Sequence, residues 1–445
     1  MSLSDTIAAI ATAPGRGGVA VVRVSGPDAW SVAAKVTGRT IGDRQVGRFF
    51  FSRFWRRGAL TEDQGTAAVA DSGLVLVSKA PHSYTGEDVV EFQGHGGSVA
   101  PRRVLEACFA AGARLARRGE FTERAFLNGK LDLAAAEAVI DLVDARTDRA
   151  ADDAQARLAG ALSVRYNALY AEALELSGRM EHLLDVSEDE LPTGTMEMIA
   201  EEIGNLRRRI DWLIATGREG RILREGALVV LAGAPNAGKS SLMNALLGEG
   251  RAIVSAEAGT TRDSIEEGME IDGWPVRLTD TAGLRQAEGA AEAEGVKRAE
   301  ALIARADVVV ALDCDIPGAL RIHAKCDLDE EERRSAYGGT EACAGSEPLC
   351  VSSKTGEGLE MLKCAIAGRL AALAEKGDEE AADVTARQLS LLEKAANALH
   401  GMAVVDPVLA ANALRCAAEA IGEIIGKTYS SDLLDALFTR FCVGK

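Results

Sequence analysis

Nine residues, 233 to 241, read Gly-Ala-Pro-Asn-Ala-Gly-Lys-Ser-Ser and match the phosphate-binding pattern G-x-x-x-x-G-K-[ST]. The apolar run 227–232 precedes the loop as a buried strand would, and residues 240–247 follow it with helical composition. Backbone N–H groups of such a loop surround a polyphosphate at the positive end of the helix dipole. The alternative is a glycine-rich turn that binds nothing. With strand and helix in place, the loop predicts a nucleoside triphosphate site.

The loop residues have distinct expected roles. Lys239 reaches the outer phosphates and supports catalysis, and the Ser240 hydroxyl suits a magnesium ion. The residues expected to contact the nucleotide here are Asn236, Ala237, Gly238, Lys239, Ser240 and Ser241.

The motifs that follow indicate a GTPase rather than a general ATPase. In a switch-like segment at 259–263, the Thr261 hydroxyl is expected to bind magnesium. Gly259, Thr260 and Thr261 of this segment are expected to contact the nucleotide. A hairpin is predicted from two strands, 266–271 and 274–279, joined by Asp272-Gly273. It leads into Asp280, Thr281, Ala282 and Gly283, which supply an acidic residue for the metal shell and a glycine N–H for the γ-phosphate.

The base-recognition motif departs from the usual Asn-Lys-x-Asp. Residues 324–327 read Ala-Lys-Cys-Asp, so Lys325 and Asp327 are present but Ala324 replaces the asparagine. Ser352, Ser353 and Lys354 fit the last nucleotide-contacting loop. Only seven residues separate Asp313 from Arg321, and successive parallel strands usually need ten or more. We expect the crossover helix in 314–321 to be shortened or missing, and guanine specificity to persist; an ordinary strand exit at 323–328 is the alternative.

Hydrolysis requires a group that orients water. Leu284 stands where many GTPases place a glutamine and is unable to do this. Three acidic residues follow, Glu288, Glu292 and Glu294, of which one could act on a water while the others form a solvated face.

Composition limits the remaining classes of function. The apolar runs are too short to span a bilayer, and no signal peptide is recognised at 1–6, so a cytoplasmic chain is expected. Eight scattered cysteines and five histidines show no zinc or disulfide spacing. The net charge of −17 argues against an evenly basic nucleic-acid binder. Residues 1–130 nevertheless hold 17 Lys and Arg against 12 Asp and Glu, which could meet phosphates or an anionic small molecule.

Periodicity predicts a multidomain α/β plus all-α chain. An α/β domain is expected at 1–125, a helical domain at 126–222, a Ras-like P-loop GTPase domain at 223–374 and a second helical part at 375–445. The last part is too short for a core of its own, so it should pack on the first helical part, with the GTPase domain inserted between them. A final helix with an apolar stripe of Leu433, Leu434, Leu437, Phe438 and Phe441 is expected to be capped by Ser431.

Two polar residues stand out in the N-terminal part. Arg23 lies in the otherwise apolar run 19–24, so its guanidinium needs an internal carboxylate or an anionic ligand. His95 closes another strand, and alone it favours a structural role.

The chain resembles the MnmE (TrmE) family of tRNA-modification GTPases. Besides the GTPase motifs, the resemblance rests on Asp5-Thr6-Ile7-Ala8-Ala9, Pro14-Gly15-Arg16-Gly17-Gly18, Ser83-Tyr84-Thr85-Gly86-Glu87-Asp88, His95-Gly96-Gly97, Gly119-Glu120-Phe121-Thr122, Asn128-Gly129-Lys130 and the ending Phe441-Cys442-Val443-Gly444-Lys445. These motifs cover nearly the whole chain. Cys442 occupies the family's near-terminal cysteine position, and Ala324 is the main departure.

The resemblance implies a homodimer whose N-terminal domain binds 5-formyl- or 5,10-methylene-tetrahydrofolate, with contacts at Arg23, Glu87, Lys130 and Lys445. It implies that the chain works with an FAD protein, MnmG, in a heterotetramer that modifies the wobble uridine of certain tRNAs at C5, without DNA or a membrane. The added group is aminomethyl or carboxymethylaminomethyl. It further implies potassium held by Asn236, Ser255, Glu257 and Thr260, and Glu292 as the residue that orients water.

Two other functions compete with this one. A nucleotide-switched ribosome assembly factor would leave the folate-like motifs without a role. A folate-dependent one-carbon enzyme that acts without RNA would bind neither tRNA nor an FAD partner.

Overall fold

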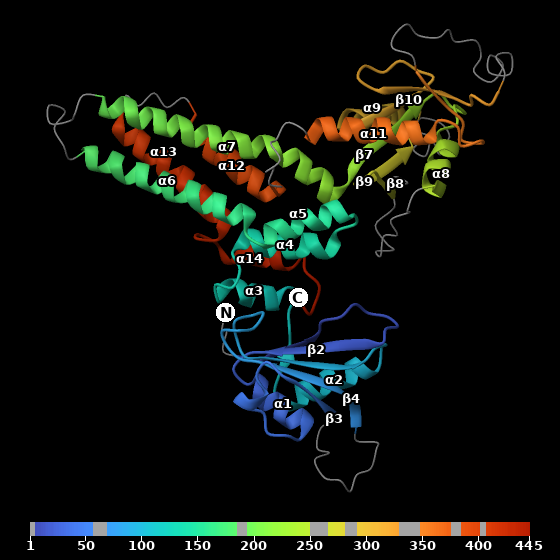
Figure 1. The fold of residues 1–445 in the computed structure, drawn as a ribbon. Coiled ribbons are helices and arrows are strands. Elements are labelled where there is room, and N and C mark those ends of the chain that lie inside the picture. The colour runs from blue at the N-terminus through green and yellow to red at the C-terminus, as the bar shows by residue number, and fades with distance from the viewer. Residues whose placement is uncertain are drawn as a thin grey trace. The chain divides into compact units, whose positions relative to one another are not determined.

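The computed structural model describes residues 5–56, 69–184, 194–249, 266–280, 292–328, 348–374, 384–400 and 406–445; for residues 184, 216, 218, 249 and 292–298 only the backbone is described. The chain divides into two compact units (Figure 1). The first unit comprises Met1–Ile140 and Gly422–Lys445, and the second comprises Asp141–Ile421. This division into two units does not test the boundaries of the four predicted domains, which remain a prediction.

The first unit is built on a six-stranded sheet of order β3-β4-β5-β2-β1-β6. Its strands are β1 (Ile7–Ile10), β2 (Val19–Ser25), β3 (Phe49–Trp55), β4 (Val69–Ser78), β5 (Val89–His95) and β6 (Arg114–Leu115). The alternation of buried Val22 and Val24 with half-buried Val21 and Arg23 turns one face of β2 toward the core. α1 (Ala29–Thr37), the short η1 (Asp43–Gln45) and α2 (Ala100–Ala111) complete this α/β part. The apolar run 19–24 around Arg23 lies in strand β2, and His95 closes strand β5, as the sequence predicts.

The end of the chain belongs to this first unit. α14 (Ser431–Phe438) packs on α3 (Glu120–Leu127), and α4 (Leu133–Asp144) follows α3 in sequence. The tail is fixed because Arg118 Nε donates to Phe441 O (2.8 Å) and Gly119 N donates to Cys442 O (3.3 Å). The predicted cap of α14 is wrong by one residue: Ser430, not Ser431, accepts from Leu433 N, because Ser430 alone of the two has extended backbone outside the helix.

The second unit contains the sheet that carries the phosphate-binding loop, with order β12-β11-β10-β7-β9-β8. The strands are β7 (Ala227–Gly233), β8 (Glu266–Ile271), β9 (Trp274–Asp280), β10 (Val308–Leu312), β11 (Leu320–Ala324) and β12 (Leu349–Val351). β8 and β9 form the predicted hairpin, and the other neighbours are parallel. α8 (Lys239–Glu249) and α11 (Leu359–Ala374) contribute to the apolar core beside the sheet, and α9 (Glu292–Arg305) also contacts β7.

The connection between β10 and β11 has no helix, as its length predicted. The two strands pair in parallel, with Val310 opposite Leu320 and Leu312 opposite Ile322. Residues 313–319 join them through turns, and Arg321 forms an ion pair with Asp315 within this connection. Along β11, the polar residues Arg321 and His323 alternate with the buried residues Ile322 and Ala324.

Some helices of the second unit precede the GTPase sheet in the sequence, and others follow it. They are α5 (Asp148–Leu158), α6 (Ala161–Leu184), α7 (Thr195–Glu225), α12 (Ala386–Ala398) and α13 (Pro407–Ile425), which runs on into the first unit. α7 lies beside α12 (Figure 1). Tyr166 of α6 donates to Gln388 of α12 (3.1 Å), and Ser177 donates to Ala411 O of α13 (3.3 Å). The two helical segments pack together, as predicted for an inserted GTPase domain.

Within the described ranges, no helix combines the length and apolar character that a membrane crossing requires.

Candidate functional site

The phosphate-binding loop leaves β7 and enters α8 as the sequence predicts. Lys239 begins α8, is only 4% exposed, and donates from Nζ to Gly233 O (3.0 Å) and Ala234 O (2.8 Å). The ammonium group is thus held against the backbone of its own loop. Asn236 and Gly238 have φ of 62° and 96°, in the left-handed region that lets the loop curl. This geometry can present N–H groups and one cation to a polyphosphate.

Oxygen ligands for a divalent cation lie next to this loop. Ser240 Oγ donates to Asp280 Oδ2 at 2.6 Å, and both residues belong to motifs predicted for the metal shell. A hydroxyl and a carboxylate placed side by side are the hard ligands that Mg²⁺ prefers. The residues present therefore fit a magnesium ion.

The base-recognition end contacts the phosphate-binding loop through Lys325. Its Nζ donates to Asn236 O at 3.0 Å, so the two loops are tied together. Asp327 Oδ1 accepts from Ser352 Oγ at 2.7 Å, and this bond holds the pKa of the Asp327 carboxyl below its usual value. Ser352 Oγ also accepts from Lys354 N (3.3 Å). The predicted Lys325, Asp327, Ser352, Ser353 and Lys354 thus come together in the fold.

Asp313 supports the segment where the asparagine is missing. Its carboxylate accepts from Ala324 N (3.3 Å) and lies 2.8 Å from His323 Nδ1. Asp313 has φ of 49° and begins the helix-free connection. Sequence reasoning noticed Asp313 only as a boundary. The signal for its role was the brevity of the connection, which keeps it close to β11.

Several predicted residues lie outside the described residues. They are Ser255, Glu257, Gly259, Thr260, Thr261, Thr281, Ala282 and Gly283. Glu292 is the first residue of α9, and its side chain is not among those described.

A second cluster of predicted residues gathers in the first unit around Arg23. Arg23 Nε donates to Glu91 Oε1 at 2.8 Å, which supplies the internal carboxylate expected of a guanidinium in an apolar strand. Its guanidinium carbon also lies 5.0 Å from the ring centre of Tyr84 and 5.6 Å from that of Phe121, within cation–π range. Burial lowers the pKa of Lys445, and the nearby charge of Arg23 lowers it further. Arg23 thus lies beside one carboxylate and two aromatic rings, near enough to the last residue of the chain for its charge to act on Lys445.

Glu87 and Lys130 lie in the same cluster. Glu87 Oε2 accepts from Ser25 Oγ (2.7 Å), and Ser25 is two residues beyond Arg23 on the same face of β2. Lys130 Nζ donates to Pro81 O at 3.1 Å. The four residues predicted to contact folate are thus three cations and one carboxylate. Sequence reasoning missed Ser25, Tyr84 and Phe121 as neighbours of this cluster because their approach depends on strand pairing and on the docking of α3.

A buried ion network lies beneath this cluster. Glu120, only 2% exposed, accepts from Arg114 Nη2 (2.5 Å), Arg117 N (2.8 Å) and Arg124 Nη2 (3.1 Å). Burial alone would raise the pKa of Glu120, but these hydrogen bonds, that from Arg114 foremost, outweigh it and lower the pKa to about 2. The ionised form of Glu120 is therefore the form that stabilises the network.

Glu120→Gln is expected to lower the free energy of unfolding at pH 7 by about 3 kcal/mol, the equivalent of this pKa shift. The folded-state pKa is depressed, so the contribution is complete above the ordinary value of 4.5 and is lost as pH falls toward about 2. Urea unfolding across this range should show a weaker pH dependence in the variant. Glu106→Gln removes an exposed carboxylate paired with Arg102 and serves as control. Equal stability of Glu120→Gln and wild type at pH 7 would contradict this account.

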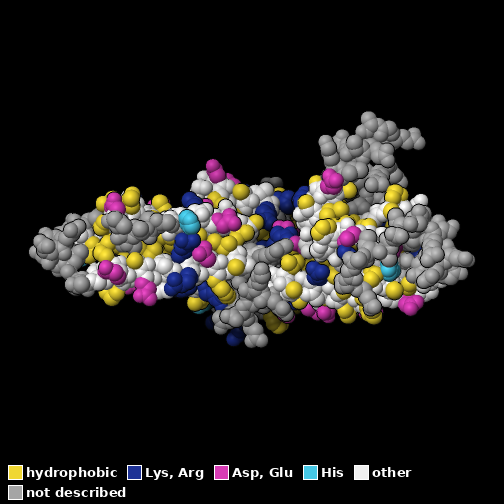
Figure 2. Space-filling model, turned by 90° about the horizontal axis from the view of Figure 1, so that it is seen from above, with side chains coloured by type: hydrophobic (Ala, Val, Ile, Leu, Met, Phe, Trp, Pro, Cys, Tyr) yellow, Lys and Arg dark blue, Asp and Glu magenta, His cyan; other side chains and the backbone are white. Residues whose placement is uncertain are grey.

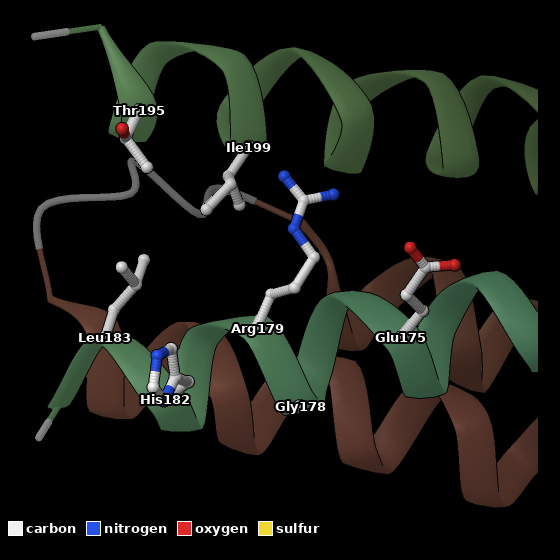
Figure 3. Close-up of a pocket in the computed structure, with 7 residues that line it drawn as sticks. All are labelled: Glu175, Gly178, Arg179, His182, Leu183, Thr195 and Ile199. Carbon is white, nitrogen blue, oxygen red and sulfur yellow. The ribbon is translucent and has the colours of Figure 1, made fainter. Parts of the chain in front are cut away.

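A cavity of about 510 Å³ lies between α6 and α7 and contains none of the predicted site residues (Figure 3). It is lined by Glu175, Gly178, Arg179, His182, Leu183, Thr195 and Ile199. Arg179 already pairs with Glu202 through Nη1 (2.5 Å).

The phosphate-binding loop, the Ser240–Asp280 pair and the Lys325–Asp327 loop, all on one largely parallel sheet, define a P-loop GTPase. Two family models match: "MnmE helical domain" over residues 133–442 and "GTP-binding protein TrmE N-terminus" over residues 6–130. The chain belongs to the MnmE family of tRNA modification GTPases, as the whole-length relatives below also show.

Two relatives illustrate the similarity. The tRNA modification GTPase MnmE of Symbiobacterium thermophilum is 42% identical over 467 residues, which cover 99% of each chain. That of Dichelobacter nodosus is 41% identical over 478 residues and covers 100% of each chain. Among solved structures, the G domain of the T. maritima FeoB iron transporter matches 33% of this chain and 98% of its own, at 27% identity. The TM-score of this match is 0.22.

Proposed function

We propose that this GTPase installs an aminomethyl or carboxymethylaminomethyl group at C5 of the wobble uridine of certain tRNAs. It would act with an FAD-dependent MnmG-type partner, in a heterotetramer, and use a tetrahydrofolate one-carbon unit. The observation that carries the proposal is the cluster of Arg23, Glu87, Lys130 and Lys445, which a GTPase without folate chemistry would not need. Family membership supplies the link to tRNA. A cytoplasmic location is proposed together with this role in tRNA modification.

In the GTPase domain, Lys239 binds the β- and γ-phosphates and stabilises the charge that develops on them. Ser240 and Thr261 would hold Mg²⁺, with Asp280 bound to Ser240 as its outer support. Asn236, Ser255, Glu257 and Thr260 would hold K⁺, and each cation would neutralise phosphate charge. The other proposed nucleotide contacts are Ala237, Gly238, Ser241, Gly259, Thr281, Ala282, Gly283, Lys325, Asp327, Ser352, Ser353 and Lys354.

Glu292 is proposed to orient the attacking water, because Leu284 has no polar group for this task.

In the first unit, the proposed folate site pairs opposite charges. The anionic glutamate tail of a folate suits Arg23, Lys130 and Lys445, while Glu87 accepts from N–H groups of the pterin ring. The lowered pKa of Lys445 results from burial first and from Arg23 second, and a bound carboxylate would offset both. The 5-formyl or 5,10-methylene derivative would supply the one-carbon unit when bound.

A homodimer is proposed from an apolar face of the first sheet. Phe49 and Phe51 of β3 are 71% and 62% exposed, and Leu74 beside Phe51 is also exposed. Aromatic residues that lie open in this way are typical of interaction surfaces. A second copy of the same face is the proposed occupant.

Phe51→Asp is expected to weaken dimerisation at least about tenfold, because it places a charge in the proposed interface. Sedimentation over a range of concentrations would measure the change. Val164→Asp alters an equally exposed apolar residue on α6 and is the matched control. A dimer unaffected by Phe51→Asp would exclude this face.

On the face shown in Figure 2, basic and acidic side chains lie interspersed with hydrophobic ones.

The proposal is tested by reconstitution with unmodified tRNA, an FAD-dependent partner, GTP and methylene-tetrahydrofolate, followed by nucleoside mass spectrometry. Modified wobble uridine that requires the chain and folate is the expected result. GTP hydrolysis in KCl against NaCl, with ATP as control, tests the potassium site separately. Hydrolysis without any uridine modification would refute the proposed reaction.

A further inference from the structure

Helix α3 and the residues after it hold the loop 83–88, which carries Glu87. Thr122 Oγ1 lies 2.8 Å from Tyr84 Oη, and Asn128 Nδ2 donates to Thr85 O at 2.7 Å. Gly86 has φ of 78°, and a Cβ there would lie against the Asn128 side chain. The loop is therefore pressed onto α3 with little freedom to move.

Arg124, at the centre of α3, extends this hold to the Glu87 carboxylate itself. The side chain is 1% exposed, and Nη1 lies 3.1 and 3.2 Å from the two carboxylate oxygens of Glu87. Ser25 Oγ donates to the same carboxylate at 2.7 Å. Contacts from two directions fix both the position and the plane of the carboxylate.

Glu87 depends on Arg124 more than the other acids of the network do. Asp5 and Glu120, which also accept from Arg124 Nη2, each have a second cation in Arg114. In the described part of the chain, Arg124 is the cation that contacts Glu87. Without Arg124, the Glu87 carboxylate would keep the hydrogen bond from Ser25 Oγ among the contacts described for it.

We propose that Arg124 and Ser25 are positioning residues that orient Glu87 for two-point recognition of the reduced pterin ring of a folate. The inference rests on the proposed folate function. A reduced pterin carries an amino group beside a ring N–H, and both donate in one plane. A carboxylate accepts both bonds only when its own plane is fixed, which is the task of Arg124 and Ser25.

The test is binding of three ligands to the full-length chain by calorimetry. The ligands are 5-formyl-tetrahydrofolate, a tetrahydropterin without the tail, and p-aminobenzoyl-glutamate without the pterin. Arg124→Met is expected to weaken binding of the first two by about ten- to a hundredfold, as for a lost charge-assisted pair, and to leave the third unchanged. Ser25→Ala should show the same pattern with a smaller loss. Glu123→Gln removes a carboxylate of α3 that pairs with Arg117, and as the control it should leave pterin affinity unchanged.

A double-mutant cycle separates positioning from general support of the fold. If Arg124 acts through Glu87, Arg124→Met adds no further loss in a Glu87→Ala background. Additive losses, or equal losses for all three ligands, would overturn the inference. If the Arg124→Met variant does not fold, the inference is tested with Ser25→Ala instead, by its binding of the three ligands and by a double-mutant cycle that combines it with Glu87→Ala. No folate binding by the unaltered chain would instead refute the proposed folate function.

Discussion

Lys239→Ala is expected to reduce GTP hydrolysis by about 10²- to 10⁴-fold. The ammonium group lies at the mouth of the loop, held by Gly233 O and Ala234 O, and is almost fully buried. Two charge-assisted bonds to phosphate oxygens are each worth about 1.5–3 kcal/mol, and alanine removes both. Because part of this interaction strengthens as charge moves onto the leaving phosphate, kcat should fall together with GTP affinity.

Initial rates and GTP titrations on the same preparations would measure both effects. Lys363→Ala removes a lysine that pairs with Glu360 on α11, and it should leave both quantities as in the wild type. Unchanged hydrolysis in Lys239→Ala would remove the loop from the mechanism. A loss confined to affinity would show that Lys239 binds the ground state and the transition state equally.

Asp327→Asn should change which base the site prefers. The carboxylate, oriented by Ser352, is proposed to accept from the N1–H and 2-amino groups of guanine. The asparagine amide has one acceptor oxygen and one donor NH₂ group, so one of the two guanine donors would face an amide N–H. The affinity for GTP should therefore fall by about 10²-fold or more. Xanthine has an oxygen in place of the amino group, so xanthosine triphosphate should gain affinity.

Competition between the two nucleotides at equilibrium would measure this exchange. Asp315→Asn changes an aspartate of the helix-free connection that pairs with Arg321, and it should not alter base preference. If Asp327→Asn kept its preference for GTP, base recognition would have to come from residues outside 324–327.

Local sequence patterns predicted the parts of the fold that depend on nearby residues. The strand, loop and helix around Lys239 and the hairpin at Asp272-Gly273 follow from short-range rules of apolar periodicity and turn geometry. The absence of a crossover helix between β10 and β11 was predicted from the number of residues between the two strands alone. The cap of α14 was misplaced by one residue because Ser430 and Ser431 are chemically equal, and only backbone conformation distinguishes them.

The long-range parts could not be predicted in the same way. Arg23 needed a carboxylate, but the choice of Glu91, 68 positions away, is made by the register of β2 and β5. The contact of Arg124 with Glu87 depends likewise on how α3 docks, which no periodicity reveals. Pairings of this kind depend on tertiary packing rather than on local pattern.

The contact between Tyr166 and Gln388 has a consequence for how the chain forms on the ribosome. The two side chains are 222 positions apart, so α6 emerges long before α12 and α13, whose residues it finally contacts. At about 5–20 residues per second, synthesis of the intervening chain takes on the order of ten seconds or more. During that time α6 lacks the helices α12 and α13 that later pack on it, and the strands of the GTPase sheet are made one after another, with β12 complete only shortly before α12 is made. The buried surface of α6 that these helices cover is therefore open to solvent while the central domain folds.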